Sequence, residues 1–536
     1  MVTSPAIPSR PALDPRLVAW LPPVGVAALV VVNAWSGVMP GVGFWDTGEF
    51  QAVLPVLGTA HPTGYPTYVI LGFIANLLLT PIGEPAFRIN VLSLIAVAVA
   101  AGATVALVRR LTGSTIVAIA TGFGLASTPL VWVNATRADP HPIHLAFVAL
   151  LLLTLVGWEQ ARRASMDDTR RADRLLLLAA VLFGLAAGNH SLTLLLVPPI
   201  GLYVLAVEPG IWRRWRFALA CLGAVAATLV VVYLELPLRG GLVPALTAPL
   251  VYAKPATWDG FWYIALAEQF RGSLADPFAN LGQKVDTLVG LASAQLGLVA
   301  LAIPPAFIVA ARRAPRYTLL TGLALLITVL FNAAYTNADI GRYYLGPVLF
   351  VWTWLGILAA ELADPVGLLV AEGVARARRI RLGDRDLGLA QAAIALVLGV
   401  GLLLPVIGDL DARRRAADRS NDRGAQTWLA EVLLVIPQNA VLVSWWSTST
   451  PLWYAQKVEG MRSDIFVVDD RTMLDLDLGR APDVINRYLG EGRPVYAIRL
   501  SGRDTDELLA QFLMTKVASA GSTAVWQVLG RLTAAR

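Results

Sequence analysis

Long apolar runs recur along most of this 536-residue chain, and they limit how it can fold more than any other feature. A helix of about 20 apolar residues crosses a hydrocarbon core about 30 Å thick, and inside a bilayer only helices and closed barrels satisfy their own backbone groups. Charged residues make up 15% of the chain, whereas a soluble domain carries about 25%. The sequence therefore predicts an all-α polytopic membrane protein with about eleven spans, at 17–35, 89–108, 114–133, 143–158, 175–188, 191–207, 217–236, 287–310, 318–335, 343–360 and 388–407.

The arginines indicate an orientation for these spans. The N-terminus and the five loops on its side hold 20 arginines, whereas the loops on the other side hold seven basic residues. Because basic residues collect in cytoplasmic loops, we expect a cytoplasmic N-terminus and long outer loops at 37–88 and 237–286. The net charge of +6 follows from the same bias and does not indicate a nucleic-acid partner. Arginine is used in place of lysine, which accounts for four of 43 basic residues, and this bias points weakly to a prokaryotic plasma membrane.

Three parts are expected along the chain. Residues 1–16 are rich in proline and predicted to be disordered and cytoplasmic, residues 17–407 form the transmembrane domain, and residues 408–536 form a small extracytoplasmic α/β domain. Within the last part, 440–444 and 465–468 have the composition of buried strands, and 504–517 has helical spacing. In the first outer loop, 68–79 is apolar but too short to span comfortably, which predicts a helix at the membrane interface.

Ionisable side chains gather on the outer side of the predicted topology. They include every histidine of the chain and several acidic and basic residues, namely Asp46, Glu49, His61, Glu84, Arg88, Arg137, Asp139, His141, His144, His190, Asp339 and Arg342. Ionisable groups at membrane depth are costly and usually face a cavity or one another. We therefore expect a polar cavity at the outer face.

Some of these residues also have a plain structural interpretation. Asp46 and Glu49 would share a helix face, and an acidic pair at a helix start can simply cap it. Arg342 can pair with Asp339 in its loop, although an arginine beside Tyr343 and Tyr344 also suits a phosphate. His61 and His190 suit an interfacial structural role equally well.

The segment 139–144 is the strongest candidate for a metal site. It carries Asp139, His141 and His144, which are residue types that bind zinc. Its two prolines, however, predict a rigid turn instead of a helical ligand face. We therefore favour a site without metal.

Five segments of the chain carry a resemblance to a known family. They are 46–50 (DTGEF), 61–66 (HPTGYP), 188–190 (GNH), 236–239 (LPLR) and 255–262 (PATWDGFW). With these segments the chain resembles the DUF2723 family, which includes the TMEM260-type protein O-mannosyltransferases and looks like part of the GT-C glycosyltransferase superfamily. The resemblance implies a membrane enzyme with a catalytic acidic residue in a long first outer loop and a lipid-phosphate-linked sugar as donor.

The resemblance also implies roles for individual residues. An acceptor hydroxyl needs a carboxylate to take its proton, and Asp46 is the expected general base, with Glu49 as the second catalytic residue. The expected donor-binding residues are His61, Arg88, Asp139, His190, Arg239, Arg342 and Tyr343, with Arg342 as the first choice for stabilising the leaving phosphate. Asp139 matches the second acidic position of such enzymes less closely, because Pro140 and His141 follow it.

The resemblance further implies a reaction that moves mannose from a polyprenyl-phosphate donor to a hydroxyl on the extracytoplasmic face, and a single displacement would invert the anomeric carbon. The expected acceptor is a protein Ser or Thr, and a glycan or a lipid acceptor would use the same geometry. Apart from the donor and the acceptor, the expected partners are membrane lipids. No cofactor is expected, and a divalent metal ion is not favoured, although Asp46 and Glu49 have the donor atoms for one.

Other functions are also consistent with many apolar spans. A transporter or lipid flippase would place its ionisable residues near the middle of the membrane in broken helices, and not at one face. An outer-face metalloenzyme would use Asp46, Asp139, His141 and His144. A non-catalytic sensor would not need so many polar residues in the membrane part. In the last part, Trp445 and Trp446 resemble the Trp-Trp-Asp motif of oligosaccharyltransferases without its aspartate, and we expect a core tryptophan pair there.

Overall fold

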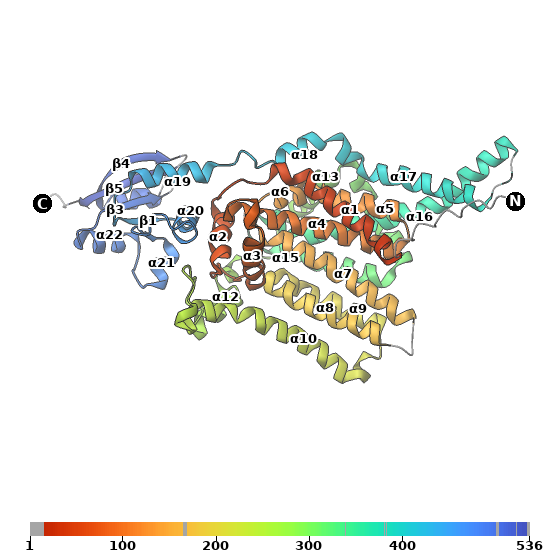
Figure 1. Cartoon of the computed structure of the whole chain (residues 1–536), viewed down its shortest axis with the longest axis horizontal. Coiled ribbons are helices and arrows are strands. Elements are labelled where there is room, and N and C mark those ends of the chain that lie inside the picture. Colours follow the sequence, from red (N-terminus) through yellow and green to blue (C-terminus); the bar gives the residue numbers. More distant parts are fainter. Residues whose placement is uncertain are drawn as a thin grey trace, which may run out of the picture.

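A bundle of long helices forms most of the molecule, and a small sheet lies at one end of its longest axis (Figure 1). The computed structural model describes residues 15–164, 169–337, 339–379, 381, 383–499, 503–520 and 523–532. The predicted disordered N-terminus therefore lies almost wholly outside the described residues. In the described chain, nine helical segments are long and apolar enough to cross a membrane. They contain α1 (Pro15–Ala34), α4 (Pro85–Thr112), α7 (Pro140–Ala164), α8 (Arg170–Asn189), α10 (Trp215–Tyr233), α13 (Leu281–Leu296) with α14 (Ile303–Arg313), α15 (Pro315–Ala334), α16 (Leu345–Arg378) and α17 (Asp384–Gly408).

The remaining two of the eleven predicted spans are helical but not simple spans. The span predicted at 114–133 is broken into α5 (Thr115–Ala126) and α6 (Pro129–Ala135), which are bent by 64°. Pro129 explains the break, because proline starts a helix easily but does not continue one. The span predicted at 191–207 is a 3-10 turn followed by α9 (Val197–Val207).

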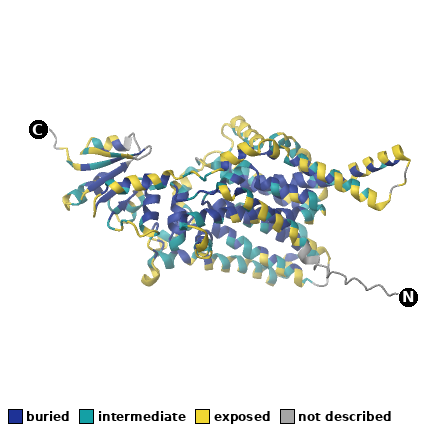
Figure 2. Cartoon of the chain, turned by 45° about the horizontal axis from the view of Figure 1, so that its top comes forward, coloured by how far each residue is buried: buried dark blue, intermediate teal, exposed yellow. Residues whose placement is uncertain are grey.

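The helices in the middle of the bundle are buried, and those at its edge face outward. α4 packs against α1, α5 and α7, and most of its side chains are buried. α10 packs mainly against α8 and keeps large apolar side chains such as Leu222 and Val231 exposed. Figure 2 shows the buried middle of the bundle and its more exposed edge. An apolar surface of this kind is suited to lipid. The chain is a multi-pass membrane protein, as predicted.

Two short helices of the first long loop cover one end of the bundle. They are α2 (Trp45–Val53) and α3 (Pro66–Leu78). The helix predicted at 68–79 is therefore confirmed, and its position relative to the membrane stays a prediction. The long loop between α10 and α13 holds α11 (Glu235–Pro237) and α12 (Trp258–Ala265).

The C-terminal part contains a five-stranded sheet in the order β2-β1-β3-β5-β4. The neighbouring strands β2 (Phe466–Val468), β1 (Val441–Ser444) and β3 (Val495–Arg499) pair in parallel. β5 (Thr523–Arg531) pairs antiparallel with β3 on one side and with β4 (Phe512–Ala520) on the other. The strands predicted at 440–444 and 465–468 are confirmed. The boundary predicted at 407 stays a prediction. The helices of this part are α18 (Leu410–Ala417), α19 (Gly424–Val435), α20 (Trp446–Lys457), α21 (Asp470–Asp475), α22 (Ala481–Gly490) and α23 (Arg503–Leu509).

The helix predicted at 504–517 is wrong in its second half. α23 ends at Leu509, and the chain then enters β4 at Phe512. β4 pairs with β5 along its length, and this tertiary contact overrides the local helical spacing.

The C-terminal part packs directly on the first long loop. α20 contacts α2, the ring of Phe44 lies 5.4 Å from that of Trp428, and the Tyr454 hydroxyl accepts a hydrogen bond of 3.2 Å from the backbone of Ala86. This contact closes one side of the cavity described next.

Candidate active site

A cavity of about 780 Å³ lies where the end of the helix bundle meets the loops and the C-terminal part. The predicted site residues Asp46, His61, His190, Arg342 and Tyr343 line it. A cavity with ionisable groups in its wall is therefore present, as expected from the sequence, although much of its lining is apolar. Its location at the outer face stays a prediction. Glu49, Arg88, Asp139 and Arg239 do not line it, although Glu49 and Asp139 contact residues that do.

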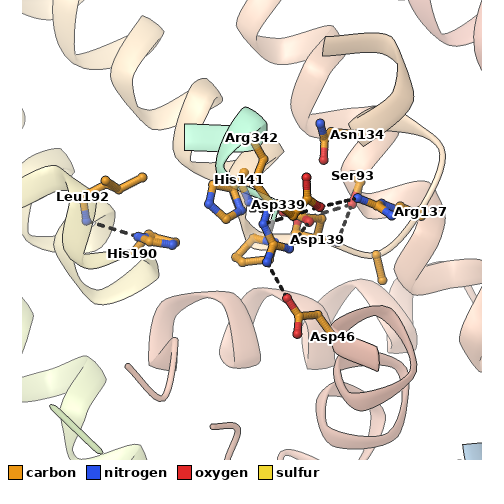
Figure 3. Close-up of polar contacts among 12 residues, drawn as sticks. Asp46, Ser93, Asn134, Arg137, Asp139, His141, His190, Leu192, Asp339 and Arg342 are labelled. Atoms are coloured by element: carbon orange, nitrogen blue, oxygen red, sulfur yellow. Dashed lines mark hydrogen bonds and ion pairs between the residues drawn. The ribbon is translucent and has the colours of Figure 1, made fainter. Parts of the chain in front are cut away.

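Arg342 joins the two acidic residues of the site. Its Nη2 donates to Oδ2 of Asp46 at 2.6 Å, and its Nη1 donates to Oδ2 of Asp139 at 3.0 Å. Asp339 lies further away, with Oδ2 3.8 Å from Nε of Arg342. Figure 3 shows Asp46 approaching the guanidinium from α2, with Asp139 and His141 on its other side. Charge-assisted bonds of this length are strong and directional, so Arg342 fixes the positions of both carboxylates.

Both carboxylate oxygens of Asp139 are already engaged by protein groups. Its Oδ1 accepts hydrogen bonds from the backbone nitrogen and Nδ1 of His141, at 2.8 and 2.7 Å, and its Oδ2 is bound to Arg342. Burial alone would raise the pKa of the Asp139 carboxyl, but His141 and Arg342 hold that pKa well below its ordinary value. Asp139 is therefore an ionised anchor for Arg342 and His141.

The side chain of Asp46 is more exposed than that of Asp139. Its side chain is 25% exposed, whereas that of Asp139 is 2% exposed. Only Oδ2 of Asp46 is engaged by a described residue, and Oδ1 has no such bond. Asp46 sits in the first turn of α2, where a carboxylate is favoured by the helix dipole. It is thus the carboxylate of this pair that can receive a proton from a molecule in the cavity.

Glu49 lies one turn after Asp46 in α2 and binds His61. Oε2 of Glu49 is 2.6 Å from Nδ1 of His61, and Oε1 accepts from the His61 backbone nitrogen at 2.7 Å. The other ring nitrogen, Nε2, is 3.2 Å from the Tyr65 hydroxyl. Burial alone would lower the pKa of His61, but Glu49 outweighs it and raises the pKa above its ordinary value of 6.5. Glu49 therefore holds the loop at 54–65 against α2, and simple capping of α2 is not its role.

The segment 140–144 is helical, which corrects the rigid turn predicted from its prolines. α7 begins at Pro140, so both prolines lie in its first turn, where no backbone donor is lost to the helix. The rings of His141 and His144 lie near that of His190, the residue that follows α8, with centroids 4.6 and 6.0 Å from it. In the part of the chain that the structure describes, no three His, Cys, Asp or Glu side chains are grouped as metal ligands.

Two of the predicted donor-binding arginines lie elsewhere. Arg239 donates to the backbone carbonyls of Val56 and Leu57, at 3.0 and 2.8 Å. Arg88 donates to the carbonyls of Gly83 and Asn76. Both side chains tie loop backbone together, and neither lines the cavity.

The C-terminal part supplies a wall of the cavity that sequence reasoning missed. Trp446, Asp470 and Arg471 line it, and Arg471 lies over the rings of Tyr252 and Tyr263 at 4.8 and 5.0 Å. Trp446 packs against the core of the C-terminal part, as expected. It is only half-buried, however, and its ring lies 5.9 Å from that of His61 at the cavity wall. No motif marks Arg471.

Comparisons with known proteins agree with this architecture. Residues 46–210 match the family model described as the protein O-mannosyl-transferase TMEM260 N-terminal domain. The resemblance is confirmed. The protein O-mannosyl-transferase TMEM260 of mouse (Mus musculus) is 26% identical over 452 residues, which are 80% of this chain and 59% of the mouse protein. The corresponding Dictyostelium discoideum protein is 24% identical over 165 residues, which are 30% of this chain and 20% of that protein. The chain thus spans less than two thirds of either relative.

Solved structures show the same fold at low sequence identity. ArnT from Cupriavidus metallidurans, bound to undecaprenyl phosphate, has a TM-score of 0.59 and 15% identity and covers 96% of this chain and 98% of its own. The oligosaccharyltransferase of Archaeoglobus fulgidus in its apo form has a TM-score of 0.50 and 14% identity and covers 90% of this chain and 69% of its own. The fold class predicted from the sequence, a GT-C-type membrane protein, is therefore correct. The relatives named above come from eukaryotes and the solved structures from a bacterium and an archaeon, so the prokaryotic source stays a prediction.

Proposed function

We propose that this chain is a membrane glycosyltransferase that moves mannose from a polyprenyl-phosphate donor to a hydroxyl of an acceptor at the extracytoplasmic face. One observation carries the proposal: Arg342 holds Asp46 at the wall of a cavity while Asp139 balances its charge. The GT-C-type fold and the match to the TMEM260 N-terminal domain support it.

The proposed reaction is a single displacement. The acceptor oxygen attacks the anomeric carbon, the bond from that carbon to the phosphate oxygen breaks, and the electron pair leaves with the polyprenyl phosphate. Asp46 takes the proton of the attacking hydroxyl through Oδ1, the oxygen that Arg342 leaves free. Attack opposite the leaving group inverts the anomeric configuration.

The leaving phosphate needs a cation that is not already neutralised. Among the described residues, the arginines that line the cavity are Arg271, Arg342 and Arg471. Arg471 is bound to Asp475, and Arg342 serves Asp46 and Asp139. Arg271 is 60% exposed and has one long contact, 3.5 Å, with Glu268. We therefore propose that the phosphate binds Arg271. This is an alternative to Arg342, the residue first expected to stabilise the phosphate.

A binding assay separates these two arginines. Arg271→Ala should weaken binding of polyprenyl phosphate about tenfold or more, because one charge-assisted contact is lost. Arg342→Lys should reduce transfer more than lipid binding, since a lysine cannot bridge both carboxylates. If Arg342→Lys loses lipid affinity and Arg271→Ala does not, the phosphate belongs to Arg342.

Mannose and a protein hydroxyl are proposed because the mouse relative is named a protein O-mannosyl-transferase. A polyprenyl carrier is proposed because ArnT, which shares the fold, was solved with undecaprenyl phosphate. Such a donor also suits the outer face, where cytoplasmic nucleotide sugars are not present.

The proposal is tested with the full chain in lipid nanodiscs, Ser/Thr-rich peptides, and a panel of short-chain polyprenyl-phosphate sugars that includes mannose. We expect mannose on peptide hydroxyls, with release of polyprenyl phosphate. Absence of transfer to peptide, glycan or lipid acceptors from every donor of the panel, by protein that stays folded, would contradict the proposal.

A further inference from the structure

Two buried histidine nitrogens beside the cavity have no hydrogen-bond partner among the described residues. They are Nε2 of His141 and Nε2 of His190. Both side chains are almost fully buried, with 2% and 4% exposure, and both residues line the cavity wall. A buried polar nitrogen without a hydrogen-bond partner destabilises a fold, so a pair of them in residues of a cavity wall points to a ligand.

The other ring nitrogen of each histidine fixes where its hydrogen lies. Nδ1 of His141 faces Oδ1 of Asp139 at 2.7 Å. An ionised carboxylate can only accept, so Nδ1 carries the hydrogen and Nε2 of the neutral ring is an acceptor. Nδ1 of His190 accepts from the backbone nitrogen of Leu192 at 3.1 Å (Figure 3). The neutral ring of His190 therefore carries its hydrogen on Nε2, which is a donor.

The two rings lie together, with centroids 4.6 Å apart, and Tyr343 packs against both at 5.0 and 5.7 Å. Of these two neighbouring rings, His141 thus offers an acceptor and His190 a donor. A hydroxyl group both donates and accepts, and so it can satisfy both nitrogens. An ammonium group only donates and a carboxylate only accepts, so each would leave one nitrogen unpaired.

We propose that His141 and His190 form a hydroxyl-reading pair that binds a ring hydroxyl of the donor sugar and disfavours an amino group at that position. The proposal rests on the proposed transferase function. Its placement follows from Asp139, which holds His141 on one oxygen and Arg342 on the other, and Arg342 in turn holds Asp46. This chain of contacts links the pair to Asp46, and the proposal places the pair beside the reacting carbon, where it sets which sugar is used.

The test uses polyprenyl-phosphate mannose and its monodeoxy and monoamino analogues with the full chain in nanodiscs. An asparagine amide reaches about as far as Nδ1 of a histidine, and a glutamine amide about as far as Nε2. His190→Asn should therefore keep the bond to Leu192 and lose the donor, whereas His190→Gln keeps the donor. His141→Asn should likewise keep the bond to Asp139 and lose the acceptor at the position of Nε2. His144→Asn is the matched control, because His144 contacts Thr193 through Nδ1 at 3.2 Å and does not line the cavity.

We expect one deoxy analogue and its amino counterpart to bind the wild type at least about tenfold more weakly than mannose does, because both lose bonds to buried partners. In His190→Asn and His141→Asn this affinity difference between the analogues and the mannose donor (the analogue penalty) should disappear, while the KM for the normal donor rises. His190→Gln and His144→Asn should retain the penalty. Binding of polyprenyl phosphate without sugar should be unchanged in all four variants.

A penalty that is equal in wild type and in His190→Asn would overturn the hydroxyl-reading pair and leave the transferase proposal standing. The same holds if no analogue differs from mannose in the wild type. If the wild type binds polyprenyl phosphate but transfers no sugar to any acceptor, the proposed function fails, and the pair fails with it.

Discussion

The two ends of the helix bundle differ in how their arginines and carboxylates are matched. α7 connects them, with His141 in its first turn and Glu159 near its other end. At the far end some carboxylates are shared by two arginines: Glu208 accepts from Arg162 and Arg214 at 3.2 and 3.1 Å. At the cavity end a single arginine, Arg342, serves several carboxylates.

This difference separates a structural network from a reactive one. Where two arginines share one carboxylate, as at Glu208, the negative charge is neutralised, which suits a helix end anchored at a membrane surface. Excess carboxylate leaves one oxygen of Asp46 without a cation beside a cavity, which is what a general base requires. Four substitutions test the contrast, and they are given from the largest expected effect to the smallest.

Asp46→Asn should reduce the rate of transfer about 10³-fold, the usual contribution of a general base. The protein should fold and bind lipid normally, because asparagine keeps an acceptor for Arg342. Single-turnover transfer and a thermal melt are the measurements. Asp276→Asn is the control, since Asp276 is exposed and does not line the cavity. A near-normal rate in Asp46→Asn would remove Asp46 from the role of base.

Asp139→Asn should damage both activity and stability. It removes a buried charge that anchors Arg342 and His141, and breaking a buried pair of this kind costs about 3–5 kcal/mol. The melting temperature of the purified protein and the transfer rate per folded molecule should both fall. Loss of activity with an unchanged melting temperature would instead make Asp139 a direct participant in the reaction.

Glu208→Gln at the far end should lower stability and leave catalysis alone. Its carboxylate is 7% exposed and holds Arg162 and Arg214, and loss of hydrogen bonds to charged groups costs about 1–3 kcal/mol. The expected result is a lower melting temperature with an unchanged kcat. A kcat reduced as strongly as in Asp139→Asn would show that the two networks are coupled and would remove the contrast.

The smallest effect concerns pH. Because the pKa of His61 is raised by Glu49 despite burial, protonated His61 stabilises the fold. This contribution is complete below the unfolded pKa of about 6.5 and is lost as pH rises through the higher folded value. Melting temperatures of the wild type should therefore fall above pH 6.5 relative to those of Glu49→Gln. Parallel curves for the two proteins would show that His61 is not charged in the fold.

The sequence predicted the membrane architecture well because apolar length and arginine placement are local signals. It missed the bend before Pro129, although that proline is a local signal. It also missed the strand after Leu509, because pairing with β5 overrides the local helical spacing. It also picked out Asp46 and Arg342 separately but not the bond between them, which joins residues 296 positions apart.

Side chains of the cavity were predictable only where a motif carried them. His61 and His190 lie in conspicuous segments, whereas Arg471 reaches the cavity because α21 packs near Tyr252. The opposite hydrogen-bond polarity of His141 and His190 depends on Asp139 and the Leu192 backbone. No spacing rule contains such information.

The most direct test of the account is a structure of the full chain in nanodiscs with a non-transferable polyprenyl-phosphate mannose analogue. The account predicts the sugar in the cavity, with its anomeric carbon facing Oδ1 of Asp46, a ring hydroxyl on the His141 and His190 pair, and the phosphate at Arg271. A sugar bound outside this cavity, or one whose anomeric carbon faces away from Asp46, would contradict it.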